Sequence, residues 1–223
     1  MKKKVLKIYL FRHGRTVYNV KEMFTGHKHT KLTFRGKIDA KRVAKKLKNK
    51  KFEVAFHTSL PRSKETLNYV LKFHPECKKI LIDDRMIERS YGILEGTKHK
   101  DFIKKVGKKS YDLRVEGDAI ENLKPALRRK VEKFLGEEEY KAIHRGYEVA
   151  APRGESFLDV EKRVKSFIVY LKKFMKKNKV NAAISAHGNS IRLFRKVMEN
   201  ASREKTVKWF IPYDKVFVYD LEV

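Results

Sequence analysis

Phe11-Arg12-His13-Gly14-Arg15-Thr16 and Ser185-Ala186-His187-Gly188-Asn189-Ser190 are two short stretches with one shared pattern, and they lie near opposite ends of the chain. In each, a histidine directly precedes a glycine at the end of an apolar run. Such runs are typical of buried strands, so each strand is predicted to deliver its histidine to a strand end. Because open α/β sheets place their sites at the carboxyl ends of strands, the repeated His-Gly pair predicts one shared site. An arginine before the first histidine and Asn-Ser after the second indicate that this site binds an anion.

Strand and helix patterns alternate between and around these two stretches. Strands are predicted at about 5–11, 52–56, 80–82, 182–184 and 216–219, and helices at about 33–47, 61–73 and 155–174 and from 189 onward. This alternation predicts an α/β fold with a largely parallel sheet covered by helices on both faces. The polar tract at about 93–154 interrupts the rhythm with short helical patterns only. We therefore expect one domain, residues 1–223, that carries an insertion.

Length and composition bound the class of protein. The chain has 223 residues, enough for one complete hydrophobic core. No apolar run approaches the roughly 18 residues of a membrane span, and the first residues lack a signal-peptide pattern, so we expect a cytoplasmic protein with no membrane partner. Its single cysteine, Cys77, excludes an internal disulfide and lacks the paired spacing of a zinc site.

The formal net charge of +28 raises the question of nucleic-acid binding, because lysine and arginine neutralise phosphates. Most of this charge is lysine spread along amphipathic helices such as residues 41–48, where it forms a solvated outer face. We therefore expect no specific nucleic-acid partner. A basic nucleic-acid-binding module is the third and least favoured interpretation.

Four motifs follow one another along the chain. They are Arg12-His13-Gly14 with Thr16 and Asn19, Thr58-Ser59-Leu60-Pro61-Arg62-Ser63 with Thr66, Glu88-Arg89-Ser90-Tyr91-Gly92, and Ala186-His187-Gly188. In this order they resemble the motifs of the histidine phosphatase superfamily, also called the phosphoglycerate mutase-like family. The resemblance spans nearly the whole chain. It implies a three-layer α/β/α sandwich with a mainly parallel sheet, in which the insertion is a partly helical lid segment.

The same residue types suit phosphoryl transfer. A neutral histidine can accept a phosphoryl group, and nearby arginines lower its pKa, so Arg12 and Arg62 are expected to keep His13 deprotonated. Planar guanidinium groups match the equatorial phosphoryl oxygens, and His187, either cationic or as an N–H donor, adds to them. The resemblance assigns protonation of the leaving oxygen to Glu88. These five residues are the expected catalytic set, and the scheme requires no metal.

Several features resemble the mutase branch of the family. Phe24-Thr25-Gly26 resembles its substrate loop, and residues 187–192 match its form of the second histidine motif. Lys108-Lys109 aligns with an arginine pair that clamps the substrate in mutases. The residues expected to contact the substrate are Asn19, Thr25, Gly26, Arg89, Tyr91, Lys108, Lys109, Gly188 and Asn189. A contribution from Lys98, His99 or Lys100 is left open.

Three departures from the mutase pattern leave two enzyme functions open. Lysine is a point charge, so Lys108 and Lys109 hold a carboxylate or phosphate less rigidly than two arginines would. Met23 stands where mutases usually have an arginine, and Arg15 replaces an acidic residue. The resemblance predicts interconversion of 3-phosphoglycerate and 2-phosphoglycerate with 2,3-bisphosphoglycerate as primer. The alternative is a phosphomonoester phosphatase with a different or broad substrate, because looser clamping favours hydrolysis. Either enzyme has a small phosphorylated substrate, and either is compatible with a monomer or a homo-oligomer.

Overall fold

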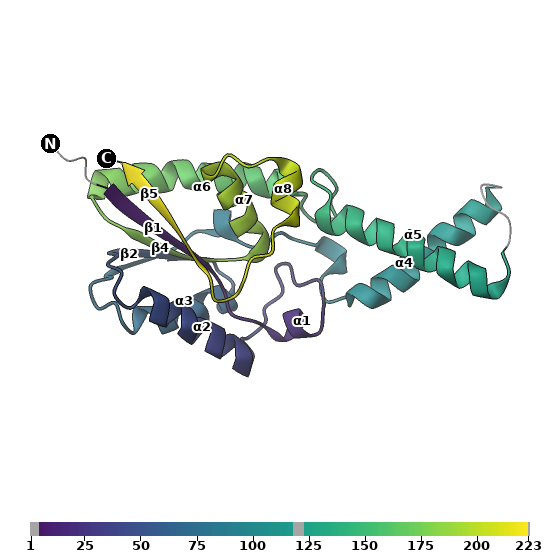
Figure 1. Ribbon diagram of the computed structural model, residues 1–223, viewed down its shortest axis with the longest axis horizontal. Coiled ribbons are helices and arrows are strands. Elements are labelled where there is room, and N and C mark those ends of the chain that lie inside the picture. Colours follow the sequence, from purple (N-terminus) through teal and green to yellow (C-terminus); the bar gives the residue numbers. More distant parts are fainter. Residues whose placement is uncertain (1–4, 118–122, 223) are drawn as a thin grey trace.

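A five-stranded sheet with the order β3-β2-β4-β1-β5 forms the centre of the molecule in a computed structural model, which describes residues 5–117 and 123–222 (Figure 1). The strands are β1 (Val5–Arg12), β2 (Val54–His57), β3 (Lys79–Ile82), β4 (Ala182–Ala186) and β5 (Val216–Glu222). β1 pairs in parallel with β4, β4 with β2, and β2 with β3, whereas β5 runs antiparallel to β1. The mainly parallel sheet expected from the alternating pattern is confirmed.

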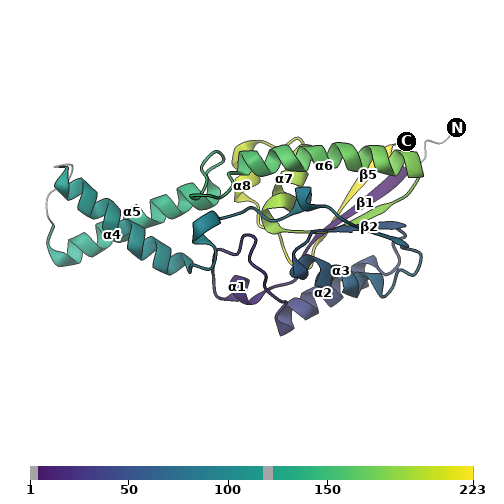
Figure 2. The ribbon, with the colours of Figure 1, turned by 180° about the vertical axis from the view of Figure 1, so that it is seen from behind.

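Helices cover both faces of this sheet (Figures 1 and 2). One face carries α2 (Phe34–Leu47) and α3 (Pro61–Leu71), and the other carries α6 (Phe157–Asn178), α7 (Gly188–Met198) and α8 (Arg203–Lys208). Side chains alternate along a strand, so Ile8 and Leu10 of β1 pack into the apolar cluster under α6 and α7, while Tyr9 and Phe11 pack under α2 and α3. The fold is therefore the three-layer α/β/α sandwich.

Local signals explain where the helices begin. The Thr33 hydroxyl accepts a hydrogen bond of 3.0 Å from the Gly36 N–H and caps α2. Pro61 is the first residue of α3, where its missing N–H costs no hydrogen bond. Ser156 and Asp159 cap α6 reciprocally. Three short helical turns, α1 (Val17–Val20), η1 (Asp84–Met86) and η2 (Gly92–Leu94), lie in the connecting segments.

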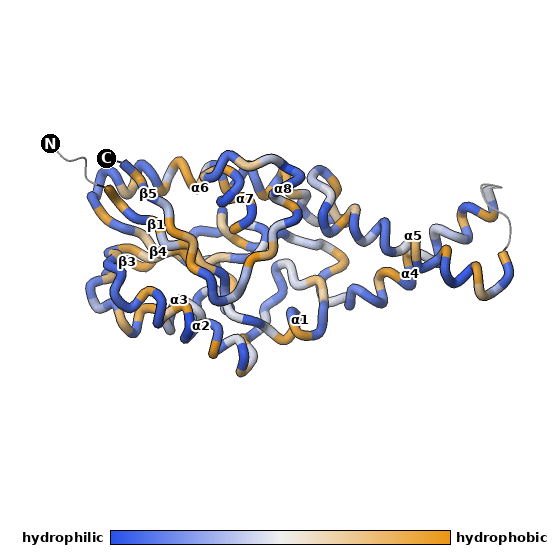
Figure 3. The backbone as a smooth tube through the Cα atoms, in the orientation of Figure 1, coloured by the Kyte–Doolittle hydropathy of each residue, from blue (hydrophilic) through white to orange (hydrophobic). Residues whose placement is uncertain are grey.

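The insertion forms a long helical hairpin, so the expectation of short helical patterns only is wrong. Helices α4 (His99–Glu116) and α5 (Pro125–Arg145) project from the sandwich (Figure 1), and hydrophilic residues predominate along them (Figure 3). The two backbones meet at Gly107 and Gly136, where an added Cβ would lie 1.9 or 2.0 Å from a main-chain oxygen of the other helix. A protruding pair buries little apolar surface, so its sequence shows little helical periodicity. None of the helices within the described ranges is long and apolar enough to cross a membrane.

Candidate active site

The two histidines meet because their strands are neighbours. β1 and β4 run in parallel with Arg12 opposite Ala186, so His13 and His187 both follow the last strand residue at the same edge of the sheet. The His13 N–H donates a hydrogen bond of 3.0 Å to the Ala186 carbonyl. Both side chains are buried, and their ring centroids lie 5.0 Å apart. Parallel pairing thus turns two distant His-Gly motifs into one site.

The geometry of His13 leaves one ring nitrogen free to act as a nucleophile. Nδ1 lies 2.7 Å from the Gly14 carbonyl oxygen. Only a protonated nitrogen can donate to that oxygen, so Nδ1 carries the hydrogen and Nε2 keeps its lone pair in the neutral ring. Burial, followed by the charges of Arg62 and Arg12, lowers the pKa of His13 well below its usual value. The sequence indicated the effect of the arginines, whereas burial, the larger cause, is a property of the fold.

Arg12 and Arg62 are held by main-chain carbonyl oxygens. Arg62, buried in the first turn of α3, donates to the Gly26 and Lys28 oxygens at 2.8 and 2.9 Å. Arg12 donates to the Ile211 oxygen at 2.9 Å. The Nε atoms of both arginines are buried and have no partner among the described residues. Burial lowers the pKa of Arg62 to about 10, so the group stays cationic at neutral pH. Both guanidinium groups therefore keep donors for an oxyanion.

His187 faces the same space in a neutral form. Its Nε2 lies 2.8 Å from the hydroxyl of Thr58, which follows β2 at this edge of the sheet. Its Nδ1 is buried without a partner in the part of the chain that the structure describes. Burial, then the charges of Arg62 and His13, lowers the pKa of His187 well below its usual value. Of the two forms considered from the sequence, this environment favours the neutral N–H donor.

Glu88 supplies a carboxylate to the pocket. Its Oε1 accepts hydrogen bonds from the main-chain N–H groups of Arg89 at 2.9 Å and Asn189 at 3.1 Å. The side chain is nearly buried but lines the pocket. These contacts orient the carboxyl group from two elements, the segment after η1 and the start of α7. A carboxyl group held in this way can exchange a proton with a bound oxygen.

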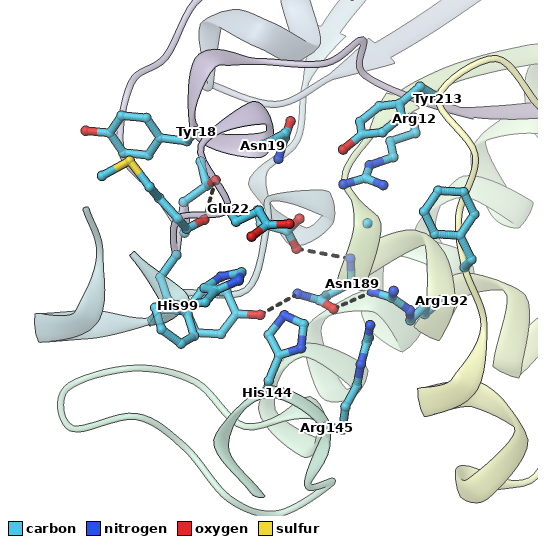
Figure 4. Close-up of a pocket in the computed structure, with 18 residues that line it drawn as sticks. Arg12, Tyr18, Asn19, Glu22, His99, His144, Arg145, Asn189, Arg192 and Tyr213 are labelled. Atoms are coloured by element: carbon cyan, nitrogen blue, oxygen red, sulfur yellow. Dashed lines mark hydrogen bonds between the residues drawn. The ribbon is translucent and has the colours of Figure 1, made fainter. Parts of the chain in front are cut away.

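A cavity of about 440 Å³ opens at this edge of the sheet (Figure 4). Arg12, Glu88 and six of the expected substrate contacts line it: Asn19, Thr25, Gly26, Tyr91, Gly188 and Asn189. Asn189 links two of its neighbours, donating to the Tyr91 hydroxyl at 3.4 Å and accepting from Arg192 at 2.7 Å. The structure therefore gathers residues from β1, α7 and the intervening loops around one hollow.

Three expected substrate contacts lie elsewhere. Arg89 is fully buried beside the pocket, where its guanidinium group packs on Tyr91 and donates to the Ile143 carbonyl. Lys108 and Lys109 are exposed on α4 and do not line the cavity. Of the three residues left open, His99 lines the cavity, whereas Lys98 and Lys100 line a separate hollow beside α1.

Two arginines that the sequence did not single out contribute positive charge to the pocket. Arg145 ends α5, and one of its terminal nitrogens is buried without a partner among the described residues. Burial, then the charges of Arg145 and Arg12, lowers the pKa of Arg192 to about 9. Arg192 lies three residues after Asn189 and therefore on the same helix face, so the motif at 187–192 already indicated that Arg192 faces the pocket. Arg145 had no local signal, because only the return of the hairpin brings it to the pocket.

The substitution at Arg15 has a structural explanation. Its Nε and a terminal nitrogen each donate at 2.8 Å to the carboxylate of Asp39, which is buried in α2. The bidentate pair joins the loop after β1 to the helix that covers the sheet. Arg15 therefore binds within the protein and does not line the cavity.

Comparison with known proteins identifies relatives over nearly the whole chain. The sequence profile of the histidine phosphatase superfamily (branch 1) matches residues 8–137 and 125–222. A protein of Staphylococcus epidermidis named 2,3-bisphosphoglycerate-dependent phosphoglycerate mutase is 32% identical over 227 residues, which cover 96% of this chain and 94% of that protein. The Mesorhizobium japonicum protein of the same name is 28% identical over 215 residues, which cover 95% and 90% of the two chains.

Two solved structures have a similar fold and different names. The α-ribazole phosphatase of Shigella flexneri matches with a TM-score of 0.70 and 21% identity over 98% of this chain and 95% of that chain. A phosphoglycerate mutase of Bacillus anthracis matches with a TM-score of 0.70 and 21% identity over 99% and 89%. At these identities the two structures establish the fold and leave the reaction to be argued from the site.

Proposed function

The chain belongs to the histidine phosphatase superfamily, and within it we propose that the protein interconverts 3-phosphoglycerate and 2-phosphoglycerate through a phosphohistidine at His13. Arg145 and Arg192 support this proposal most directly, because they add two cations to the cavity that Arg12 also lines. In the view of Figure 4, Arg145 lies on the side opposite Asn19 and Tyr213. A substrate with two anionic groups can therefore place its phosphoryl group at His13 and its carboxylate near Arg145.

The proposed reaction uses His13 twice. Nε2 of His13 attacks the phosphorus of 2,3-bisphosphoglycerate, and the bond to the departing oxygen breaks while Glu88 protonates that oxygen. A monophosphoglycerate leaves, and the enzyme is primed as phospho-His13. A hydroxyl of bound 3-phosphoglycerate then attacks this phosphorus while Glu88 takes the hydroxyl proton. The bisphosphate formed turns in the pocket and returns its other phosphoryl group to His13. Glu88 gives its proton to the departing oxygen, and 2-phosphoglycerate leaves.

Donors around His13 stabilise the charge that spreads over the transferring oxygens. The guanidinium groups of Arg12 and Arg62 and the N–H of His187 are already oriented by the protein, so they need no rearrangement during the reaction. Gly188 lies against Arg12, since a Cβ at this position would be in van der Waals contact, 3.4 Å from its guanidinium carbon. No step of the proposed reaction uses a metal ion. 2,3-Bisphosphoglycerate is the primer, and the proposed place of action is the cytoplasm.

A phosphatase reaction in the same pocket is the second candidate. It is favoured by the positions of Lys108 and Lys109, which lie outside the cavity on the projecting hairpin. A mutase must retain its bisphosphate and shield phosphohistidine from water, and a pocket with fewer clamping groups admits water more readily. Hydrolysis of phospho-His13 would then release inorganic phosphate.

One assay separates the two reactions. The protein is supplied with 3-phosphoglycerate, with and without trace 2,3-bisphosphoglycerate, and both 2-phosphoglycerate and inorganic phosphate are followed. Isomerisation that depends on the bisphosphate supports the mutase, and release of phosphate without isomerisation refutes it in favour of the phosphatase.

Variants of the same protein test the mechanism. We expect His13→Ala to abolish turnover and Glu88→Gln to slow it less, because the nucleophile is indispensable and the proton donor can be partly replaced by water. His29→Ala, at an exposed histidine outside the cavity, is the control. Activity of His13→Ala at the level of the wild-type protein would exclude the phosphohistidine.

A further inference from the structure

The segment 209–213, between α8 and β5, contacts two arginines of the pocket through its main chain. The carbonyl oxygen of Trp209 accepts a hydrogen bond of 2.7 Å from Nε of Arg192. The carbonyl oxygen of Ile211, two residues later, accepts one of 2.9 Å from Arg12. Arg12 ends β1 and Arg192 lies on α7, so one short segment orients cations that come from two different elements.

Tyr213 adds a third contact from the same segment. The guanidinium carbon of Arg12 lies 4.0 Å from the centroid of the Tyr213 ring, within the range of a cation–π interaction. Arg12 has one hydrogen bond to the Ile211 oxygen, and its Nε is buried without a partner in the described part of the chain. The aromatic ring therefore restricts the plane of a guanidinium group that a single hydrogen bond leaves free to rotate.

The segment is itself anchored at several points, so its carbonyl groups have defined positions. The side chain of Ile211 is fully buried in the main apolar core. The Trp209 ring lies 3.9 Å from the guanidinium carbon of Arg195. Immediately after the segment, the Asp214 carbonyl accepts a hydrogen bond of 2.6 Å from Lys46 of α2. These contacts tie the segment to both helical layers of the sandwich.

We propose that Tyr213 is a positioning residue that holds Arg12 in the plane required to bind the phosphoryl group beside His13. The segment 209–213 also sets the position of Arg192, and with it the spacing between the phosphoryl end of the pocket and the second anion. This inference rests on the proposed phosphoryl transfer at His13 and extends it to a residue that itself transfers neither proton nor phosphoryl group.

Binding of orthovanadate, an analogue of the phosphoryl group, tests the role of Tyr213 without any substrate. Isothermal titration of Tyr213→Leu is expected to show about tenfold weaker binding than the wild-type protein, because the cation–π contact is lost. Tyr213→Phe keeps the ring and is expected to bind within twofold of wild type. Tyr170→Leu is the matched control, because Tyr170 packs on Arg85 with 4.7 Å between guanidinium carbon and ring centroid and does not line the cavity.

A double-mutant cycle separates positioning from a direct contact. In an Arg12→Ala background, Tyr213→Leu is expected to cause no further loss of vanadate affinity, because the arginine that it orients is absent. Equal losses in both backgrounds, or wild-type affinity in Tyr213→Leu, would overturn the proposal. If Tyr213→Leu does not fold, Tyr213→Met replaces it, because methionine is similar to leucine in volume and also lacks the aromatic ring. The failure of the proposed function has a different appearance: the wild-type protein would bind vanadate but form no phosphohistidine.

Discussion

Replacing Arg145 by methionine is expected to stabilise the free protein while impairing its reaction. Arg145 lies at the end of α5, with one terminal nitrogen buried and unpaired among the described residues. Burial lowers its pKa. Its own charge is the largest electrostatic cause of the lowered pKa of Arg192. Arg145→Met removes this repulsion and keeps an apolar stem of similar length.

The magnitudes follow from the two states of the pocket. A buried donor without a partner costs about 1–3 kcal/mol. Because part of that cost is relieved by local movement, we expect the free energy of unfolding to rise by about 1 kcal/mol, which corresponds to roughly 2–4 °C in melting temperature for a chain of this size. With substrate bound, the same group makes a charge-assisted hydrogen bond worth about 1.5–3 kcal/mol. Its loss should lower kcat/KM for 3-phosphoglycerate by roughly 10- to 150-fold.

Calorimetric melting and steady-state kinetics measure the two effects on the same preparations. Orthovanadate has no second anionic group, so its affinity should stay within about twofold of wild type in Arg145→Met. Arg129→Met, on the exposed face of the same helix, is the matched control and should change neither quantity. A lower melting temperature together with unchanged kcat/KM would refute the assignment of Arg145 to a substrate anion.

Three further perturbations test the pocket and its surroundings. Burial lowers the pKa of His13, His187 and His144, a histidine that lines the cavity, so the unfolded chain binds more protons below pH 6.5 and stability falls as the solution is acidified. Urea titrations at pH 7 and pH 5 should differ by about 2 kcal/mol for each histidine that stays neutral, and equal midpoints would contradict this. Replacing both Lys108 and Lys109 by alanine tests whether they contact the substrate, as the sequence predicts. Because both side chains are exposed, we expect less than a twofold change in kcat/KM. A tenfold loss would show that they do contact the substrate. Gly26→Ala should cost about 1–2 kcal/mol in a urea titration and slow turnover, because φ is +47° and the new Cβ would lie 1.9 Å from Oε1 of Glu95. Unchanged stability in that variant would show that the loop adapts.

The central part of the site was predictable from local sequence. His13 and His187 end apolar runs, and Arg62 follows the proline that begins a helix. Parallel strands place their carboxyl ends at one edge of a sheet, so these short patterns were enough to bring both histidines together. Glu88 came from the resemblance of its motif, and the structure places it against the N–H of Asn189 at the start of α7.

Contacts between distant segments determined the rest of the site, which includes the hairpin, Arg145 and Tyr213. The polar sequence of the insertion gave no measure of the length of α4 and α5, which meet at glycines that a sequence pattern treats as interruptions. Lys108 lies nine residues after His99 on α4, and because this segment is one continuous helix, that separation places it about 14 Å further from the pocket. The return of α5 brings Arg145 to the site, and the segment before β5 brings Tyr213 against Arg12. Periodicity reports which face of an element is buried, and only tertiary packing determines which distant side chain that face meets.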